Sequence, residues 1–204
     1  MRRKRINEKK SKPRTPSGAA VMQKSVTQAI ERAMFEEWAK VGYSAFTIEA
    51  VAKRAGVGKA AIYRRWPSKL AMVNDCVTRV GTDLITSPNT GNLHSDIRLM
   101  LEQLRRILRH PLVTRILPDL HAELPRTPEL ASHIRSAVQA QRRSSAETVL
   151  RNAMSRKELA ADLDIDLALD ALGSIIYWRI IVTKKRADNA YLDRLTAFIV
   201  KGLK

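Results

Sequence analysis

The sequence predicts an all-α protein in which a small N-terminal three-helix domain precedes a larger helical bundle, with about nine helices in total. Apolar residues recur every three or four positions over most of the 204 residues, and proline- and glycine-rich breaks separate these periodic segments. Basic residues are also concentrated at the N-terminal end. We therefore expect three parts: a disordered arm (1–20), a three-helix domain (21–70) and a helical second domain (71–204).

The three-helix domain begins with an amphipathic helix predicted from about residue 25 to 41. Thr47 is a favourable N-cap for a second helix, and Gly56 ends that helix because glycine adopts a positive φ without a Cβ penalty. A third helix follows at 58–64 after the turn at Val57. Two short helices joined in this way predict a helix-turn-helix.

The third helix is expected to bury Ala61 and Ile62 and to point a small, basic and aromatic face outward. That face contains Lys59, Ala60, Tyr63 and Arg64. Side chains of these kinds on a short helix suit the major groove of DNA, where cations donate to guanine and a small residue can meet a thymine methyl group.

One ordered set of residues extends this interpretation: Gly42-Tyr43, Thr47, Val51-Ala52, Ala55-Gly56-Val57, Ile62-Tyr63, Trp66 and Ser68-Lys69. With it, the stretch from Ile30 to Val73 resembles the DNA-binding domain of the tetracycline-repressor (TetR) family. Two positions depart from the family pattern. Gly58-Lys59-Ala60 lacks a hydroxyl at the start of the recognition helix, and Arg65 adds a cation where relatives commonly have histidine.

The resemblance implies a homodimeric, ligand-responsive repressor, and it assigns two roles at the DNA. Thr47, Tyr63 and Lys69 would hold phosphates, because hydroxyls and a cation at helix N-termini suit anions. Lys59, Ala60 and Arg64 would face base edges. The expected DNA-binding residues are Thr47, Gly58, Lys59, Ala60, Tyr63, Arg64 and Lys69.

The charge distribution also indicates a polyanion partner. The formal net charge is +17, and residues 1–70 carry 17 of the 37 basic but only 5 of the 20 acidic side chains. Such asymmetry favours nucleic acid, although general basicity of the source proteome would also produce it. The arm is rich in Lys and Arg and poor in apolar residues; it would either lie along the DNA or remain a solvated tail.

A connector helix (69–83) and a turn-rich break at 86–92 lead into the second domain, whose helical bundle itself is expected to start near residue 93. Further helices are predicted at about 95–110, 128–156, 167–182 and 189–202. Between the first two, a short helix after Pro111 is expected to end at about residue 123.

The segment 167–182 is the most apolar in the chain, with twelve apolar residues out of sixteen. It is shorter than the roughly 20 residues that a bilayer requires and contains Asp170 and Arg179, so a membrane span is not expected. A helix that is apolar on all sides must be covered by other protein segments on both of its faces. We expect a homodimer through helices at about 166–184 and 189–203, with Ile176 and Ile180 at the interface; the alternative is a monomer core that covers both faces.

No catalytic or cofactor pattern is found. The four histidines lack metal-ligand spacing, and neither a Gly-rich phosphate loop nor a G-x-S-x-G motif occurs. We therefore expect no enzymatic activity, no metal and no cofactor. The single cysteine, Cys76, excludes an intramolecular disulfide and is expected to be a buried, inert thiol; the alternative is a redox sensor. We expect the protein in the bacterial cytoplasm, associated with the nucleoid.

Helical bundles hold small molecules in apolar pockets between helices. The expected lining residues of such a pocket are His121, His133, Tyr177, Trp178 and Arg179. Trp178 could instead belong to the core or dimer interface, and Arg179 to an ion pair. The sequence thus predicts a transcriptional repressor released from a pseudo-palindromic operator by an unknown effector, with two alternatives: a regulator without an effector, or an architectural DNA-binding protein of the nucleoid.

Overall fold

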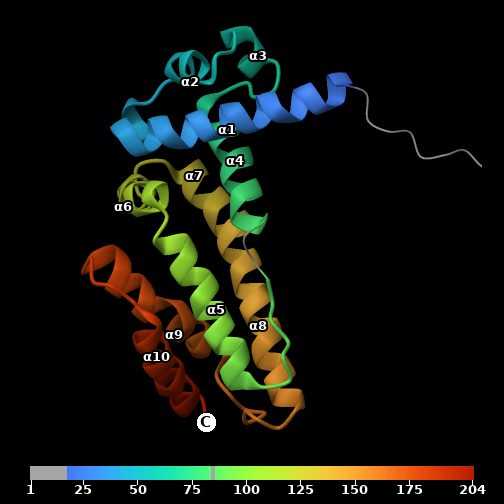
Figure 1. Cartoon of the computed structure of the whole chain (residues 1–204), viewed down its shortest axis with the longest axis vertical. Helices are drawn as coiled ribbons and strands as arrows, with labels where there is room; N and C mark the ends of the chain where they lie inside the picture. Colours follow the sequence, from blue (N-terminus) through green and yellow to red (C-terminus); the bar gives the residue numbers. More distant parts are fainter. Residues whose placement is uncertain (1–17, 84–85) are drawn as a thin grey trace, which may run out of the picture.

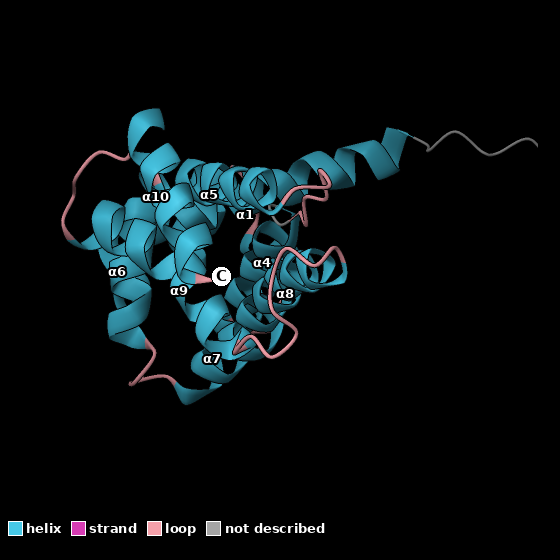
Figure 2. Ribbon diagram, turned by 90° about the horizontal axis from the view of Figure 1, so that it is seen from below, coloured by secondary structure: helices cyan, strands magenta, loops and turns pink. Residues whose placement is uncertain are grey.

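The computed structural model describes residues 18–83 and 86–204, and every regular element in these ranges is helical (Figures 1 and 2). The α-helices are α1 (Gly18–Ala45), α2 (Ile48–Ala55), α3 (Lys59–Tyr63), α4 (Lys69–Asp83), α5 (Leu93–Leu108), α6 (Pro111–Glu123), α7 (Pro128–His133), α8 (Ala140–Ser155), α9 (Ile165–Tyr177) and α10 (Asn189–Gly202). Two π-helical segments continue these helices. η1 (Ile134–Gln139) joins α7 to α8, and we call the continuous helix α7–η1–α8 the long helix; η2 (Trp178–Val182) extends α9. Counted as continuous rods, the described part of the chain has nine helices, and the all-α prediction is confirmed.

The first helix starts earlier than predicted. α1 begins at Gly18, so its first residues overlap the expected arm, and two alanines with high helix propensity follow that glycine. The rest of the arm, residues 1–17, lies outside the described residues. Near its other end, α1 is broken at Gly42, whose φ of 84° is not helical. The last turn is thereby redirected toward α2.

The helix-turn-helix forms as its capping signals predict. The Thr47 hydroxyl accepts a hydrogen bond from the amide of Ala50 at 3.2 Å, which caps α2. Gly56 adopts the left-handed conformation with φ 67°, and the Val57 amide donates to Ala52 O at 3.0 Å. α2 and α3 lie at one end of the molecule, across α1, and α4 leads from them toward the second domain (Figure 1).

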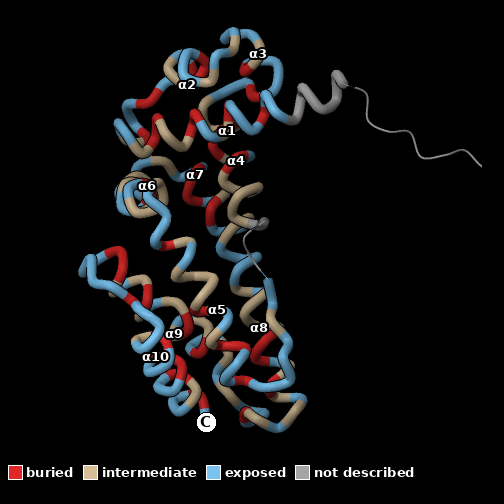
Figure 3. The backbone as a smooth tube through the Cα atoms, viewed as in Figure 1, coloured by how far each residue is buried: buried red, intermediate tan, exposed pale blue. Residues whose placement is uncertain are grey.

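The buried side chains form two cores, visible as two red zones in Figure 3. The first core combines α1 to α4 with Ile116 and Leu120 of α6 and with Leu130 and Ile134 of the long helix. The second core is built mainly from α5, α8, α9, η2 and α10. Leu117 of α6 packs against both. The N-terminal helices therefore share their core with elements of the second domain.

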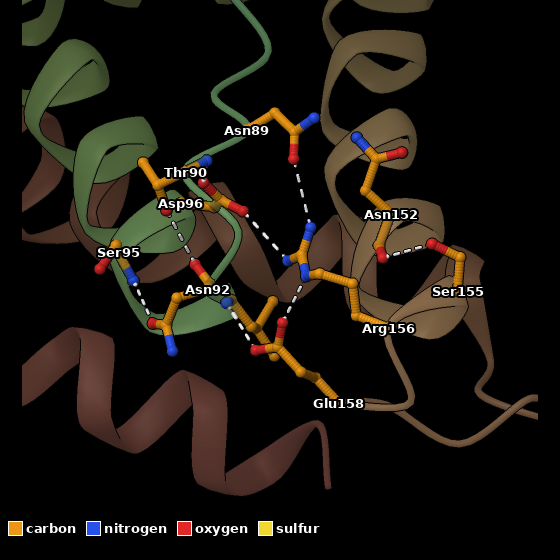
Figure 4. Close-up of polar contacts among 10 residues, drawn as sticks. Asn89, Thr90, Asn92, Ser95, Asp96, Asn152, Ser155, Arg156 and Glu158 are labelled. Carbon is orange, nitrogen blue, oxygen red and sulfur yellow. Dashed lines mark hydrogen bonds and ion pairs between the residues drawn. The ribbon is translucent and has the colours of Figure 1, made fainter.

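A polar network holds the start of α5 against the end of α8 (Figure 4). Asp96 is fully buried and accepts hydrogen bonds from the Thr90 amide at 2.7 Å and from the Arg156 guanidinium at 3.2 Å. Glu158 accepts from the Leu93 amide at 2.7 Å and pairs with Arg156 at 2.5 Å. This amide and Arg156 hold the pKa of Glu158 below its ordinary value. The network fixes the loop before α5.

Some large apolar side chains of α9, η2 and α10 remain exposed. The exposed fraction is 67% for Leu167, 61% for Trp178 and 68% for Phe198. Ile176 and Ile180, in contrast, are buried at 0% and 7%. Their expected place at a dimer interface is wrong: both face the core of their own protomer.

Cys76 is a buried free thiol, as predicted. Burial raises its pKa to about 12, so almost no thiolate is present near neutral pH. The folded protein is therefore expected to be unreactive toward a disulfide reagent such as dithionitrobenzoate. One thiol per chain should react after unfolding in guanidinium; prompt stoichiometric labelling of the native protein would contradict this burial.

Neither 18–83 nor 86–204 contains a helix that is long and apolar enough to cross a membrane. The same residues form no group of three or more His, Cys, Asp or Glu side chains that could hold a metal ion.

Candidate nucleic-acid interface

The recognition helix α3 is short and is anchored by one buried side chain. Ile62 is 0% exposed, and Gly58 precedes the helix in an extended conformation without a side-chain cap. Lys59, Ala60 and Arg64 are exposed, as is Tyr63 at 42%. The outward face of α3 is therefore the one that the sequence indicates. Of the two residues expected inside, Ile62 is buried and Ala61 is only partly buried.

The two cations on this face differ in their partners. Lys59 forms an ion pair with Glu49 of α2, and this hydrogen bond raises the pKa of Lys59. Its Nζ also lies 5.5 Å from the centre of the Tyr63 ring. No acidic group among the described residues pairs with Arg64. Arg64 is consequently free to approach a base, whereas Lys59 must first leave Glu49.

The two hydroxyls expected at phosphates are both accessible. Thr47 is exposed and uses its oxygen as an acceptor for the Ala50 amide, so its hydroxyl hydrogen can donate to a phosphate. Glu49 lies in the first turn of α2, where its negative charge would oppose a phosphate, and in the structure Lys59 pairs with this carboxylate.

Lys69 occupies a different environment from the one expected. Its Nζ donates to the backbone carbonyls of Tyr43, Ser44 at 3.2 Å and Phe46 at 3.0 Å. It also lies 4.6 Å from the Tyr43 ring and 4.5 Å from the Phe46 ring. Desolvation lowers the pKa of Lys69. All three N–H donors have protein acceptors, so in this conformation Lys69 holds the turn between α1 and α2 and has none left for a phosphate.

Asp119 of α6 is an important contact that the sequence patterns did not reveal. Its Oδ2 accepts hydrogen bonds from Trp38 Nε1 at 2.6 Å and from the Tyr43 amide at 2.8 Å. A Cβ on Gly42 would lie only 2.8 Å from Asp119 Oδ1. Glycine at 42 therefore provides both the positive φ and the room for this carboxylate. Because the partners are 76 and 81 residues apart in sequence, no local pattern could indicate the link.

Three of the five expected ligand residues, His121, His133 and Tyr177, make polar side-chain contacts within the protein. His121 Nδ1 lies 2.8 Å from the Tyr177 hydroxyl, and desolvation raises the pKa of Tyr177. His133 Nε2 lies 2.7 Å from Thr78 Oγ1 and 3.1 Å from Asn74 O, which ties the long helix to α4.

The remaining two ligand candidates lie at the surface of the second core. Arg179 donates to Arg186 O at 2.6 Å and lies 3.8 Å from the centre of the Tyr191 ring, and Trp178 is mostly exposed. None of the five lines the cavity of about 160 Å³ between α5, α8 and α9 or the open basic depression beside the loop 184–188. Of the five, only His121 and Tyr177 contact each other; His133, Trp178 and Arg179 lie against other neighbours or at the surface, so the five do not line one cavity.

The family models match both parts of the chain. Residues 30–76 match the model described as bacterial regulatory proteins, tetR family. Residues 87–199 match the model described as tetracyclin repressor-like, C-terminal domain. Together the matches include the helix-turn-helix and the bundle that contains the cavity.

Individual relatives agree with these matches. The chain is 28% identical to the HTH-type transcriptional regulator YdeS of Bacillus subtilis, over 86% of this chain and 88% of that protein. It is 26% identical to the DNA-binding transcriptional repressor TetR of Mycobacteroides abscessus, over 76% and 80%. The crystal structure of the TetR family transcription regulator SCO0332 covers 88% of this chain and 99% of its own, with 27% identity and a TM-score of 0.67. The chain belongs to the TetR family and is a helix-turn-helix DNA-binding transcriptional regulator.

Proposed function

We propose that this protein is a homodimeric repressor that binds a pseudo-palindromic operator and leaves it when a small organic effector binds the second domain. The observation that carries the DNA-binding part is the exposed face of α3, where small, basic and aromatic side chains stand on the buried anchor Ile62. The similarity to a repressor in Mycobacteroides abscessus supports the direction of regulation.

At the operator, we assign base contacts to Arg64, Lys59 and Ala60, with Gly58 allowing close approach of the helix start. Thr47 and Tyr63 would contact phosphates. The expected phosphate contact of Lys69 is replaced in this proposal by an indirect role, because its donors already hold the carbonyls of the turn.

The assignment predicts different losses for Arg64 and Tyr63. Arg64→Ala should weaken binding to the operator by about 1–3 kcal/mol and leave binding to random duplex much less affected, since a base contact is lost. Tyr63→Phe should weaken both by similar factors, since a phosphate contact carries no sequence information. Fluorescence anisotropy with an operator selected from random DNA would measure both at fixed salt.

Arg106→Ala, an exposed arginine of α5, is the charge-matched control and should change neither affinity substantially. Equal losses of Arg64→Ala on operator and random DNA would remove Arg64 from the base-reading set.

The dimer would form through α9 with η2 and through α10, the segments expected at about 166–184 and 189–203. The exposed Leu167, Trp178 and Phe198 support this surface, since large apolar groups that stay accessible in a protomer commonly mark an interface. A two-fold dimer would present its recognition helices on the order of 34 Å apart, or at a multiple of that spacing.

Regulation would use α6. This helix packs in both cores through Leu117 and is tied to the end of α1 by Asp119. An effector that favours one position of α6 would shift the population toward a conformation in which the recognition helices no longer fit the operator. By thermodynamic reciprocity, operator DNA must weaken effector binding by the same factor.

The alternatives remain distinguishable by binding measurements. A regulator without an effector would not leave DNA for any metabolite, and an architectural protein would bind operator and random duplex alike at physiological salt. The proposal places the protein in the cytoplasm, associated with the nucleoid, and assigns it no enzymatic reaction.

A further inference from the structure

The cavity between α5, α8 and α9 has walls that are largely aliphatic. α5 contributes Leu101 and Leu104, α9 contributes Leu172 and Gly173, and α8 contributes Ala146. A Cβ on Gly173 would lie 3.6 Å from Leu104 Cδ2, so the glycine leaves this wall open toward α5. With a volume of about 160 Å³, the cavity is comparable to an engineered cavity of about 150 Å³ that admits benzene.

Two neighbouring arginines line this cavity, and they differ in their ion-pair partners. Arg143 pairs with Asp166 and, at 2.6 Å, with Asp170. Arg142 also lines the cavity, but no acidic or hydrogen-bonding partner is found for it in the described ranges 18–83 and 86–204. Arg142 is exposed as a residue, and the helices packed around its guanidinium lower its pKa by desolvation. Among the residues that the structure describes, Arg142 is thus the cation at this cavity that has no acidic partner.

The π-helical segment η1 ends three residues before Arg142. A π turn inserts an extra residue into the helical repeat and rotates the side chains that follow it, and such turns are common at functional sites. Arg142 is in the first turn of α8, directly after this change of register.

We propose that this cavity binds a small organic monoanion whose apolar body lies between α5, α8 and α9 and whose carboxylate pairs with Arg142. The inference rests on the proposed regulation by an effector and specifies the chemical class of that effector. A guanidinium can bind a carboxylate through two parallel N–H···O hydrogen bonds, and the neighbouring aliphatic side chains would contact the apolar body of the ligand. The volume favours a body about the size of one ring or a short branched chain.

Isothermal titration calorimetry on the full-length protein tests the proposal. The ligands are benzoate, phenylacetate and branched short-chain carboxylates, and each is compared with its neutral amide. We expect at least one carboxylate to bind and its amide to bind at least tenfold more weakly. Arg142→Gln should reduce carboxylate affinity by about 10- to 100-fold and leave amide binding unchanged. Arg135→Gln, with the same charge change at an exposed position of the same long helix, should keep wild-type affinity.

A second variant tests the location without altering charge. Gly173→Ala adds one methyl group at ordinary contact distance from Leu104, so it should fold and should weaken the ring-bearing anions more than the smaller ones. Equal affinity of wild type and Arg142→Gln, or no binding by any carboxylate of the panel, would overturn the proposal.

Operator binding in the presence of the same anions separates this inference from the proposed function. Arg142-dependent binding that leaves operator affinity unchanged would sustain the anion site and refute the regulation by it. Another outcome is that a compound releases the protein from the operator and binds the Arg142→Gln and Gly173→Ala variants with wild-type affinity. That result would support regulation by an effector and place the effector site outside this cavity.

Discussion

A Phe198→Asp variant is expected to be a folded monomer that has lost most of its affinity for a two-half-site operator. Phe198 is 68% exposed on α10, so the substitution should not disturb the protomer core. In the proposed dimer, it would place a carboxylate without a partner in an apolar interface, which costs several kcal/mol. Sedimentation velocity would show the change in mass.

The expected loss of operator affinity has a simple cause: a dimer holds two recognition helices in one molecule, and a monomer has only one. Binding of the second half-site is intramolecular in a dimer, and this linkage raises affinity by about 10²- to 10⁴-fold. A monomer should therefore bind the full operator little better than a single half-site. Phe198→Leu, which keeps an apolar side chain, should remain dimeric; a Phe198→Asp dimer with wild-type operator affinity would place the interface on another surface.

The location of the substitution decides what this experiment reports. Ile176 and Ile180 were expected at the interface because the segment 167–182 is apolar on all sides. In the structure both face the second core of their own protomer. An aspartate at either position should unfold the protomer, and loss of the dimer in such a variant would carry no information about the interface.

The helix-turn-helix could be predicted because its signals are local. Thr47 caps α2 within the same turn, and Gly56 needs only its own positive φ to end that helix. Ile62 was identified as the anchor because it is the large apolar residue within a five-residue helix. Such features depend on neighbours within about four residues, and tertiary packing does not reverse them here.

The ligand site could not be predicted in this way, because it depends on how whole helices are rotated against one another. Trp178 starts the π-helical segment η2 and points outward, whereas Leu172, six residues earlier, lines the cavity. Neither π segment has a pattern in the sequence that marks it. Arg142 could not be distinguished from Arg143 without the acidic partners that α9 brings to only one of them.

Lys69 shows how a correct motif can lead to a different role. A cation after Ser68, at the start of α4, suggested a phosphate contact. α1 is broken at Gly42 and ends at Ala45, and the carbonyl oxygens of residues 43, 44 and 46 accept hydrogen bonds from the Lys69 ammonium group. Negative charge on Glu123 and Asp119 of α6 further stabilises the ammonium group. The position thus links the DNA-binding turn to α6.

Asp119→Ala is expected to destabilise the protein by about 2–4 kcal/mol and to uncouple α6 from α1. The substitution leaves the buried Trp38 Nε1–H and the Tyr43 amide without their acceptor, and each unsatisfied buried donor costs about 1–3 kcal/mol. It also removes a negative charge near Lys69. Urea denaturation followed by circular dichroism would give the free energy of unfolding.

Two matched variants make the result specific to this contact. Asp119→Asn retains an oxygen that can accept from both donors, so it should lose clearly less stability than Asp119→Ala. Asp193→Ala removes a surface carboxylate that pairs with Arg98 and should cost less than about 1 kcal/mol. Hydrogen exchange adds a local measurement: in Asp119→Ala the Tyr43 amide should exchange much faster, while amides in the centre of α5 should follow only the global change in stability. If Tyr43 stays as protected as those amides, Asp119 does not hold the end of α1, and α6 must influence the recognition helix through apolar packing alone.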